Sequence, residues 1–185
     1  MPDPIVNRLQ AWTLMTRGVH EVAKVVSRTY GPRGGKVMVE KGGSVLVTTD
    51  GAALTRESQL GGSLSLGATL VRSAAIRTEE EVGDGTSTTV LLTSALLRAL
   101  GKLACDSTWD PVQTVREIRE AHDIAESEIR SLSIDADQKS LNRVAMMASH
   151  EDPLIAEKVV EAVLAVGEGG SVVISPYEGT GIVSE

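Results

Sequence analysis

The stretch from Thr86 to Leu103 restricts the fold of this chain more than any other, because its residues are apolar nearly all the way round a helix. A helix without a polar face is normally covered by protein on every side. Arg98 and Lys102 interrupt the apolar run, so it does not have the pattern of a membrane span. The sequence therefore predicts a helical domain in which other elements surround this stretch.

The composition supports a folded domain and argues against several functions. The chain has 185 residues, 42% of them apolar, which is enough for one domain or for one domain and part of another. A net charge of -7 and an aromatic share of 2% argue against nucleic-acid binding, which favours basic surfaces and aromatic stacking. Cys105 is the only cysteine, which excludes an internal disulfide and a multi-cysteine metal site. Because no secretory signal pattern is present either, we expect a soluble cytoplasmic protein with no nucleic-acid partner and no membrane partner.

Hydrophobic periodicity predicts a mainly α chain with one small β-hairpin. Helices are expected at 11–28, 63–81, 86–103, 111–132, 139–148 and 153–166. Short strands are expected at 36–40, 44–48 and 171–175. Three glutamates, Glu79 to Glu81, end the second of these helices, where negative charge is unfavourable and calls for local compensation.

The segment from Gly83 to Thr89 is the strongest candidate for a functional site. Its two glycines allow a tight turn and a close approach to a ligand, and hydroxyl side chains follow at the start of the expected helix. The free amides at a helix start bind anions such as phosphate. Asp84 beside such a site suggests a bridging Mg2+, because an acid alone would repel phosphate. An ordinary capped helix start, with Asp84 or a threonine as the N-cap, is the alternative.

Two further segments have weaker signals. Gly31 to Lys36 is glycine-rich but is not a P-loop, because its spacing is one residue short and Val37 stands where Ser or Thr is required. An ordinary helix stop explains it better. Asp50-Gly51 is typical of a simple turn. Together, however, two glycine-rich loops and two Asp-Gly pairs can converge on one nucleotide and its metal.

These motifs occur in a familiar order. Thr29 to Gly34, Thr49 to Gly51 and Gly83 to Thr88 follow one another with the spacing of a chaperonin, and the chain resembles the N-terminal part of a GroEL-type chaperonin from about Thr16 to Gly181. Residues 1–15, whose first part has two prolines and no clear period, are expected to form an N-terminal arm. The resemblance implies the first half of a helical, ATP-binding equatorial domain over 16–132. It implies the start of an α/β intermediate, hinge-like domain over 133–185, with the apical domain absent.

The resemblance also implies ATP and Mg2+ as cofactors. Asp84 would hold the metal ion, and Asp50 would be an acid near the γ-phosphate. The remaining nucleotide-binding positions would be Thr29, Tyr30, Gly31, Pro32, Thr49, Gly51, Gly83, Gly85, Thr86, Ser87, Thr88 and Met147. Thr49 departs from the bacterial branch of the family, which has a basic residue there.

The function implied is that of the ATP-binding portion of a chaperonin-like chaperone, which assists protein folding through ATP-driven conformational change. The chain would assemble with copies of itself or with chaperonin-type subunits, and a longer parent chain would engage unfolded polypeptide. In the family, the acid that activates the attacking water lies in a later segment, so we expect slow hydrolysis or none from this chain alone. The alternative is a truncated relative that acts as a non-catalytic structural or interaction protein in a larger complex.

Overall fold

The computed structural model describes residues 7–31, 33–58, 60–104, 109–167 and 169–175. The chain divides into two compact units, Met1–Asp110 and Pro111–Glu185, and each is described by itself. The domain boundary expected near residue 133 stays a prediction. Pro32 and Cys105 lie outside the described residues.

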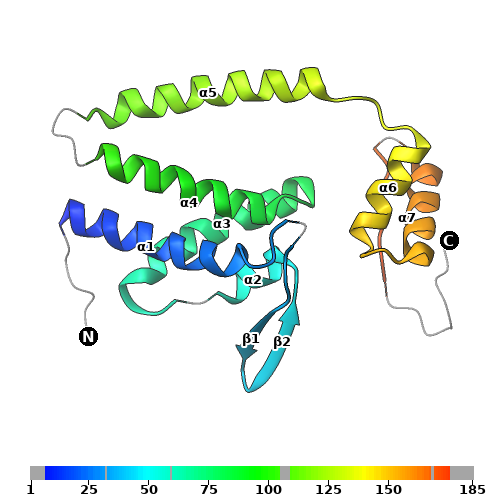
Figure 1. The fold of residues 1–185 in the computed structure, drawn as a ribbon, viewed down its shortest axis with the longest axis horizontal. Helices are drawn as coiled ribbons and strands as arrows, with labels where there is room; N and C mark the ends of the chain where they lie inside the picture. The colour runs from blue at the N-terminus through cyan, green and yellow to red at the C-terminus, as the bar shows by residue number, and fades with distance from the viewer. Residues whose placement is uncertain (1–6, 32, 59, 105–108, 168, 176–185) are drawn as a thin grey trace. The chain divides into compact units, whose positions relative to one another are not determined.

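The described elements are mostly helices, with one small antiparallel hairpin (Figure 1). This confirms the expected fold class. The first unit contains α1 (Arg8–Val26), β1 (Val37–Lys41), β2 (Ser44–Thr48), α2 (Gly51–Glu57), the 3-10 turn η1 (Gly62–Leu64), α3 (Ser65–Val82) and α4 (Thr86–Leu103). The second unit contains α5 (Pro111–Leu132), α6 (Gln138–Ala148) and α7 (Pro153–Val166).

Local signals account for several element ends. Helix α1 begins at Arg8 rather than at Ala11, because Asn7 and Gln10 form a capping box in which each side chain accepts from the other residue's amide. The arm expected over 1–15 therefore includes the first turns of this helix. In the hairpin, Val37 pairs with Thr48 and Lys41 pairs with Ser44 across the turn.

The core of the first unit lies where α1, α3 and α4 pack together. Val22, Val26, Val71 and Val90 are buried there, and burial of each valine contributes roughly 1.5 to 3 kcal/mol. Gly67 brings the backbones of α1 and α3 close together, since a Cβ at this position would lie 2.0 Å from the Met15 carbonyl oxygen.

Helix α4 has the expected bounds, but it is not covered on every side. Val90 and Ser94 are buried, whereas Leu92 and Leu96 are 58% and 48% exposed. Helices α1, α2 and α3 pack against the buried side of α4. Packing among the described residues of this unit covers one side of the helix, and cover on its other side stays an expectation.

The second unit contains a packed pair of helices, α6 and α7, joined through Ala145, Ala156 and Val160. Asp137 caps α6, and hydrogen bonds from the Ser140 hydroxyl and amide hold the pKa of this carboxyl below its usual range. Residues 171–175 form no strand, contrary to expectation, because no described segment pairs with their backbone.

None of the helices in the described ranges is long and apolar enough to cross a membrane.

Candidate nucleotide-binding site

The start of α4 follows α3 after a three-residue turn. Gly83 ends α3 with a φ of 79°, and Gly85 precedes α4 with a φ of 84°, both in the left-handed region that favours glycine. Because the N-cap of α4 is a glycine, no side chain at this position accepts hydrogen bonds from the first amides of the helix. These amides and the helix dipole form a site suited to an anion.

Asp84 does not cap this helix. Its Oδ1 accepts a hydrogen bond of 2.6 Å from the amide of Gly85, which is the residue that precedes α4. The carboxylate is exposed. The alternative of an ordinary helix start capped by Asp84 or a threonine therefore does not describe this turn, and Asp84 keeps lone pairs for a cation.

The start of α2 differs, because its amides are already satisfied. Asp50 Oδ1 accepts from the amide of Ala52 at 2.9 Å, and Oδ2 accepts from that of Ala53 at 3.1 Å. Sequence reasoning treated Asp50-Gly51 as a turn and missed this helix. The signal was present, since an aspartate before a short run of helix formers is typical of an N-cap. Of the two helix starts, the one at α4 is therefore the freer to receive an anion.

The three sequence motifs meet at the first turn of α4. Gly51 is buried, and a Cβ added to it would lie 1.8 Å from Ser87 Oγ, so the start of α2 lies directly against α4. The Tyr30 hydroxyl, from the loop after α1, lies 3.3 Å from Thr88 Oγ1. Segments separated by tens of residues are thus brought to one place.

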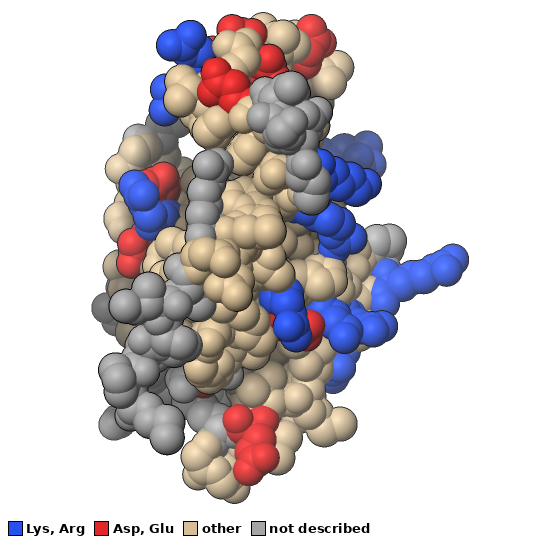
Figure 2. Space-filling model, turned by 90° about the vertical axis from the view of Figure 1, so that its left-hand side faces the viewer, with Lys and Arg blue, Asp and Glu red and all other residues tan. Residues whose placement is uncertain are grey.

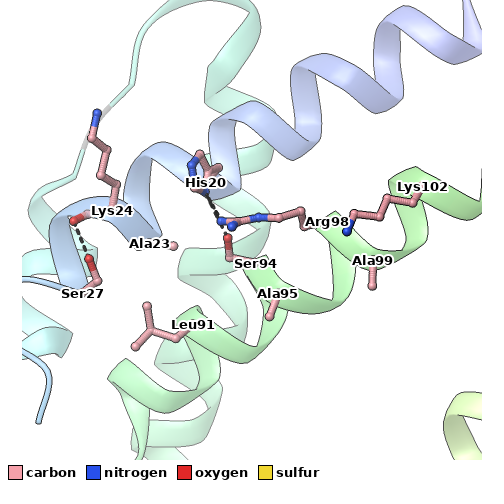
Figure 3. A pocket seen from close by; sticks show the side chains of 10 residues that line it. All are labelled: His20, Ala23, Lys24, Ser27, Leu91, Ser94, Ala95, Arg98, Ala99 and Lys102. Atoms are coloured by element: carbon pink, nitrogen blue, oxygen red, sulfur yellow. Dashed lines mark hydrogen bonds between the residues drawn. The ribbon is translucent and has the colours of Figure 1, made fainter.

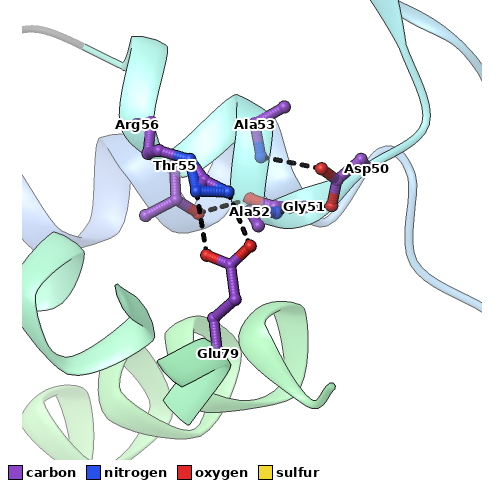
Figure 4. Close-up of polar contacts among 7 residues, drawn as sticks. All are labelled: Asp50, Gly51, Ala52, Ala53, Thr55, Arg56 and Glu79. Atoms are coloured by element: carbon purple, nitrogen blue, oxygen red, sulfur yellow. Dashed lines mark hydrogen bonds and ion pairs between the residues drawn. The ribbon is translucent and has the colours of Figure 1, made fainter. Parts of the chain in front are cut away.

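Two further contacts, which sequence reasoning did not identify, hold these elements in position. The Arg56 guanidinium binds both carboxylate oxygens of Glu79, at 2.9 and 2.6 Å, and so joins α2 to the last turns of α3 (Figure 4). This ion pair is the local compensation expected for the glutamates at the end of α3. Thr78 Oγ1 lies 3.0 Å from Thr89 Oγ1 and ties α3 to the first turn of α4.

The other expected site residues are divided between the two units and differ in how far they are buried. Thr86 is buried at the start of α4. Thr29 is half-buried and donates from its hydroxyl to the Val26 carbonyl at the end of α1, and Gly31, exposed in the next loop, has a φ of 83°. Thr49 is half-buried just before Asp50. Met147 belongs to the second unit, where it is 79% exposed on α6.

A different hollow is also present in the first unit. A groove of about 380 Å3 lies between α1 and α4, lined by residues that the nucleotide motifs do not include.

The helical arrangement of this chain matches that of solved chaperonins. Chaperonin gp146 from the bacteriophage EL 2 (Pseudomonas aeruginosa), crystallised in the presence of ATP-BeFx, superposes with TM-scores of 0.68 and 0.67 in two crystal forms. The identity is 29%, over 82% of this chain and 27% of that one. The fold is therefore that of part of a chaperonin, with helices arranged as in an equatorial domain.

Sequence comparisons agree with the structural match. A chaperonin GroEL of Methanospirillum hungatei is 31% identical over 162 residues, which are 86% of this chain and 30% of that protein. The chain belongs to the TCP-1/cpn60 chaperonin family, whose pattern it matches over residues 22–179. It spans less than a third of the length of these relatives.

Proposed function

We propose that this chain is the ATP-binding portion of a chaperonin, which assists protein folding through ATP-driven conformational change. One observation carries the proposal: the starts of α2 and α4 and the loop after α1 meet where the first amides of α4 have no side-chain cap at Gly85. Phosphate oxygens are the ligands that such a helix start favours. No observation on the described residues favours the alternative of a non-catalytic structural protein.

The residues present fit the two cofactors. Thr86, Ser87 and Thr88 offer hydroxyls beside the free amides of α4, where they can donate to phosphate oxygens. The exposed carboxylate of Asp84 is an oxygen ligand of the kind that Mg2+ prefers. Bound ATP would supply a γ-phosphate whose presence or loss changes the charge at this turn. This change of charge would drive movement of the hinge-like region, residues 133–185.

The wider activity belongs to the same proposal. Chaperonin-type subunits, copies of this chain or relatives of it, are the proposed assembly partners, and unfolded polypeptide is the proposed substrate of the longer protein. A cytoplasmic location is also proposed. Asp50 near the γ-phosphate and Met147 near the base remain predictions, as do the roles of Thr49 and Pro32.

Asp84→Asn tests the metal role. The asparagine oxygen can still accept from the Gly85 amide, but it has no negative charge for Mg2+. Because a contact with a charged group is worth roughly 1.5 to 3 kcal/mol, we expect Mg-ATP affinity to fall about tenfold or more. Calorimetry on the 185-residue chain measures this, and a smaller rise of the melting midpoint with Mg-ATP is an independent readout.

Asp135→Asn is the matched control, because it removes the same charge from an exposed carboxylate in the second unit. It should bind Mg-ATP like the unmodified chain. In EDTA, the difference between Asp84→Asn and the unmodified chain should disappear. Equal affinities of these two proteins in excess Mg2+ would contradict the metal role, and no binding by the unmodified chain would contradict the proposed function.

A further inference from the structure

The groove between α1 and α4 is lined by basic side chains and by no acidic ones. His20 and Lys24 contribute from α1, and Arg98 and Lys102 contribute from α4 (Figure 3). This concentration of basic groups occurs in a chain whose net charge is -7. Lysine and arginine side chains also gather along one side of the face drawn in Figure 2, with few carboxylates among them.

Arg98 is held in place over the groove. Its Nη2 lies 2.9 Å from His20 Nδ1, and Figure 3 shows its side chain extended toward His20. This contact places the Arg98 guanidinium beside an imidazole ring, which has no negative charge. The contact therefore orients the arginine without neutralising its charge.

The cations of the groove have no carboxylate partners among the described residues. No ion pair within the described ranges joins Lys24, Arg98 or Lys102 to a carboxylate, whereas Arg56, Arg130 and Lys158 each have one. The Ser27 hydroxyl in the lining already donates to the Lys24 carbonyl, and the Ser94 hydroxyl lies 3.5 Å from His20 Nδ1. The groove therefore presents positive charge to whatever enters it.

The apolar part of the lining distinguishes between classes of anion. Leu91 is half-buried and Ala23 is buried, so part of the groove is apolar. No Phe, Tyr or Trp side chain lines the groove, so it lacks the large aromatic faces on which the bases of single-stranded nucleic acid stack. Carboxylate side chains pair well with a guanidinium, and a peptide also supplies apolar side chains for the rest of the lining.

We infer that the groove between α1 and α4 binds an acidic peptide segment of a partner protein. The inference does not depend on nucleotide binding, because none of the residues that line the groove belongs to the nucleotide motifs. Lys24 and Lys102 also suit the last turns of their helices, where positive charge is favourable. Stabilising the two helix ends does not require Lys24 and Lys102 to line the same groove, as they do here.

Fluorescence anisotropy of the 185-residue chain with short labelled peptides tests this inference. One peptide alternates glutamate and leucine, and its counterpart alternates lysine and leucine. We expect binding of the glutamate peptide only, weakening as salt is raised toward about 0.15 M, where charges are screened beyond about 8 Å. The double variant Arg98→Glu with Lys102→Glu should lose at least tenfold in affinity, and Arg98→Gln with Lys102→Gln should lose less.

Arg77→Glu with Lys139→Glu is the matched control, because it makes the same change in net charge at exposed positions outside the groove. This control should bind the glutamate peptide like the unmodified chain. Circular dichroism melts verify that each variant is folded. Equal binding of both peptides, equal binding by the groove and control variants, or stronger binding of a single-stranded oligonucleotide than of the glutamate peptide would overturn the inference.

Discussion

Gly51 lies against Ser87 although the two residues begin different helices. Only a residue without a Cβ fits there, since the added carbon would lie 1.8 Å from the serine oxygen. At Gly85 the constraint is different, because its φ of 84° is one that L side chains rarely adopt. Glycines thus position the start of α4 both through close contact and through backbone conformation.

Gly51→Ala should separate the starts of α2 and α4. Alanine ordinarily favours a helix, but the overlap with Ser87 is severe, so we expect a net loss of about 1 to 3 kcal/mol in the free energy of unfolding. Mg-ATP affinity should fall as well. Chemical denaturation and calorimetry measure the two effects.

The control for this substitution is Gly61→Ala, because a Cβ at Gly61 meets nothing within 4 Å. Adding Ser87→Ala to Gly51→Ala should recover part of the lost stability, since the nearest remaining side-chain atom, the Cβ of residue 87, lies 3.0 Å away. Gly51→Ala with unchanged stability would mean that the two helix starts are not in contact.

At the scale of elements, α2 is a short helix held at both ends. Asp50 caps its first amides, and Arg56 joins its last turn to α3 through Glu79. A helix of this length is unstable in isolation, so its contacts with the rest of the unit must maintain it. The position of Gly51 beside α4 therefore depends on this pair of anchors.

Glu79→Gln should weaken the second anchor by a small amount. The Arg56 and Glu79 side chains are 44% and 32% exposed, so solvent screens the pair and we expect a loss of about 0.5 to 1 kcal/mol. A double-mutant cycle with Arg56→Gln, followed by denaturation, measures the coupling. Glu80→Gln controls for the charge at the end of α3, and zero coupling would contradict an energetic role for the ion pair.

At the scale of the first unit, the two sides of α4 have different environments. Val90 faces the core and is fully buried, whereas Leu92, two residues later, is 58% exposed. Apolar area contributes to stability only where it is removed from water. One side of α4 therefore stabilises the unit, and the other presents leucines at the surface.

Val90→Ala and Leu92→Ala compare these two sides directly. The first should lower the free energy of unfolding by about 2 kcal/mol, through lost methyl groups and the cavity left behind. The second should change it by no more than about 0.5 kcal/mol. Denaturation of both variants measures the difference, and equal losses would show that the leucine side is packed as well.

Local sequence determined most of the helices and the hairpin of this chain, because periodicity, caps and helix breakers act over a few residues. The bounds of α4 and α7 and the start of α5 at Pro111 follow from such signals. The three nucleotide motifs were also recognisable from their residues and order. Helix α2 was missed because its seven residues carry too weak a period to outweigh the turn signal of Asp50-Gly51.

Only the tertiary structure decided how these parts meet. The sequence pattern of α4 is apolar on all sides and does not indicate which side is buried. The contacts of Tyr30 with Thr88, of Gly51 with Ser87 and of Arg56 with Glu79 join residues far apart in the chain. Such contacts depend on the packing of whole helices, which the residues near each position do not specify.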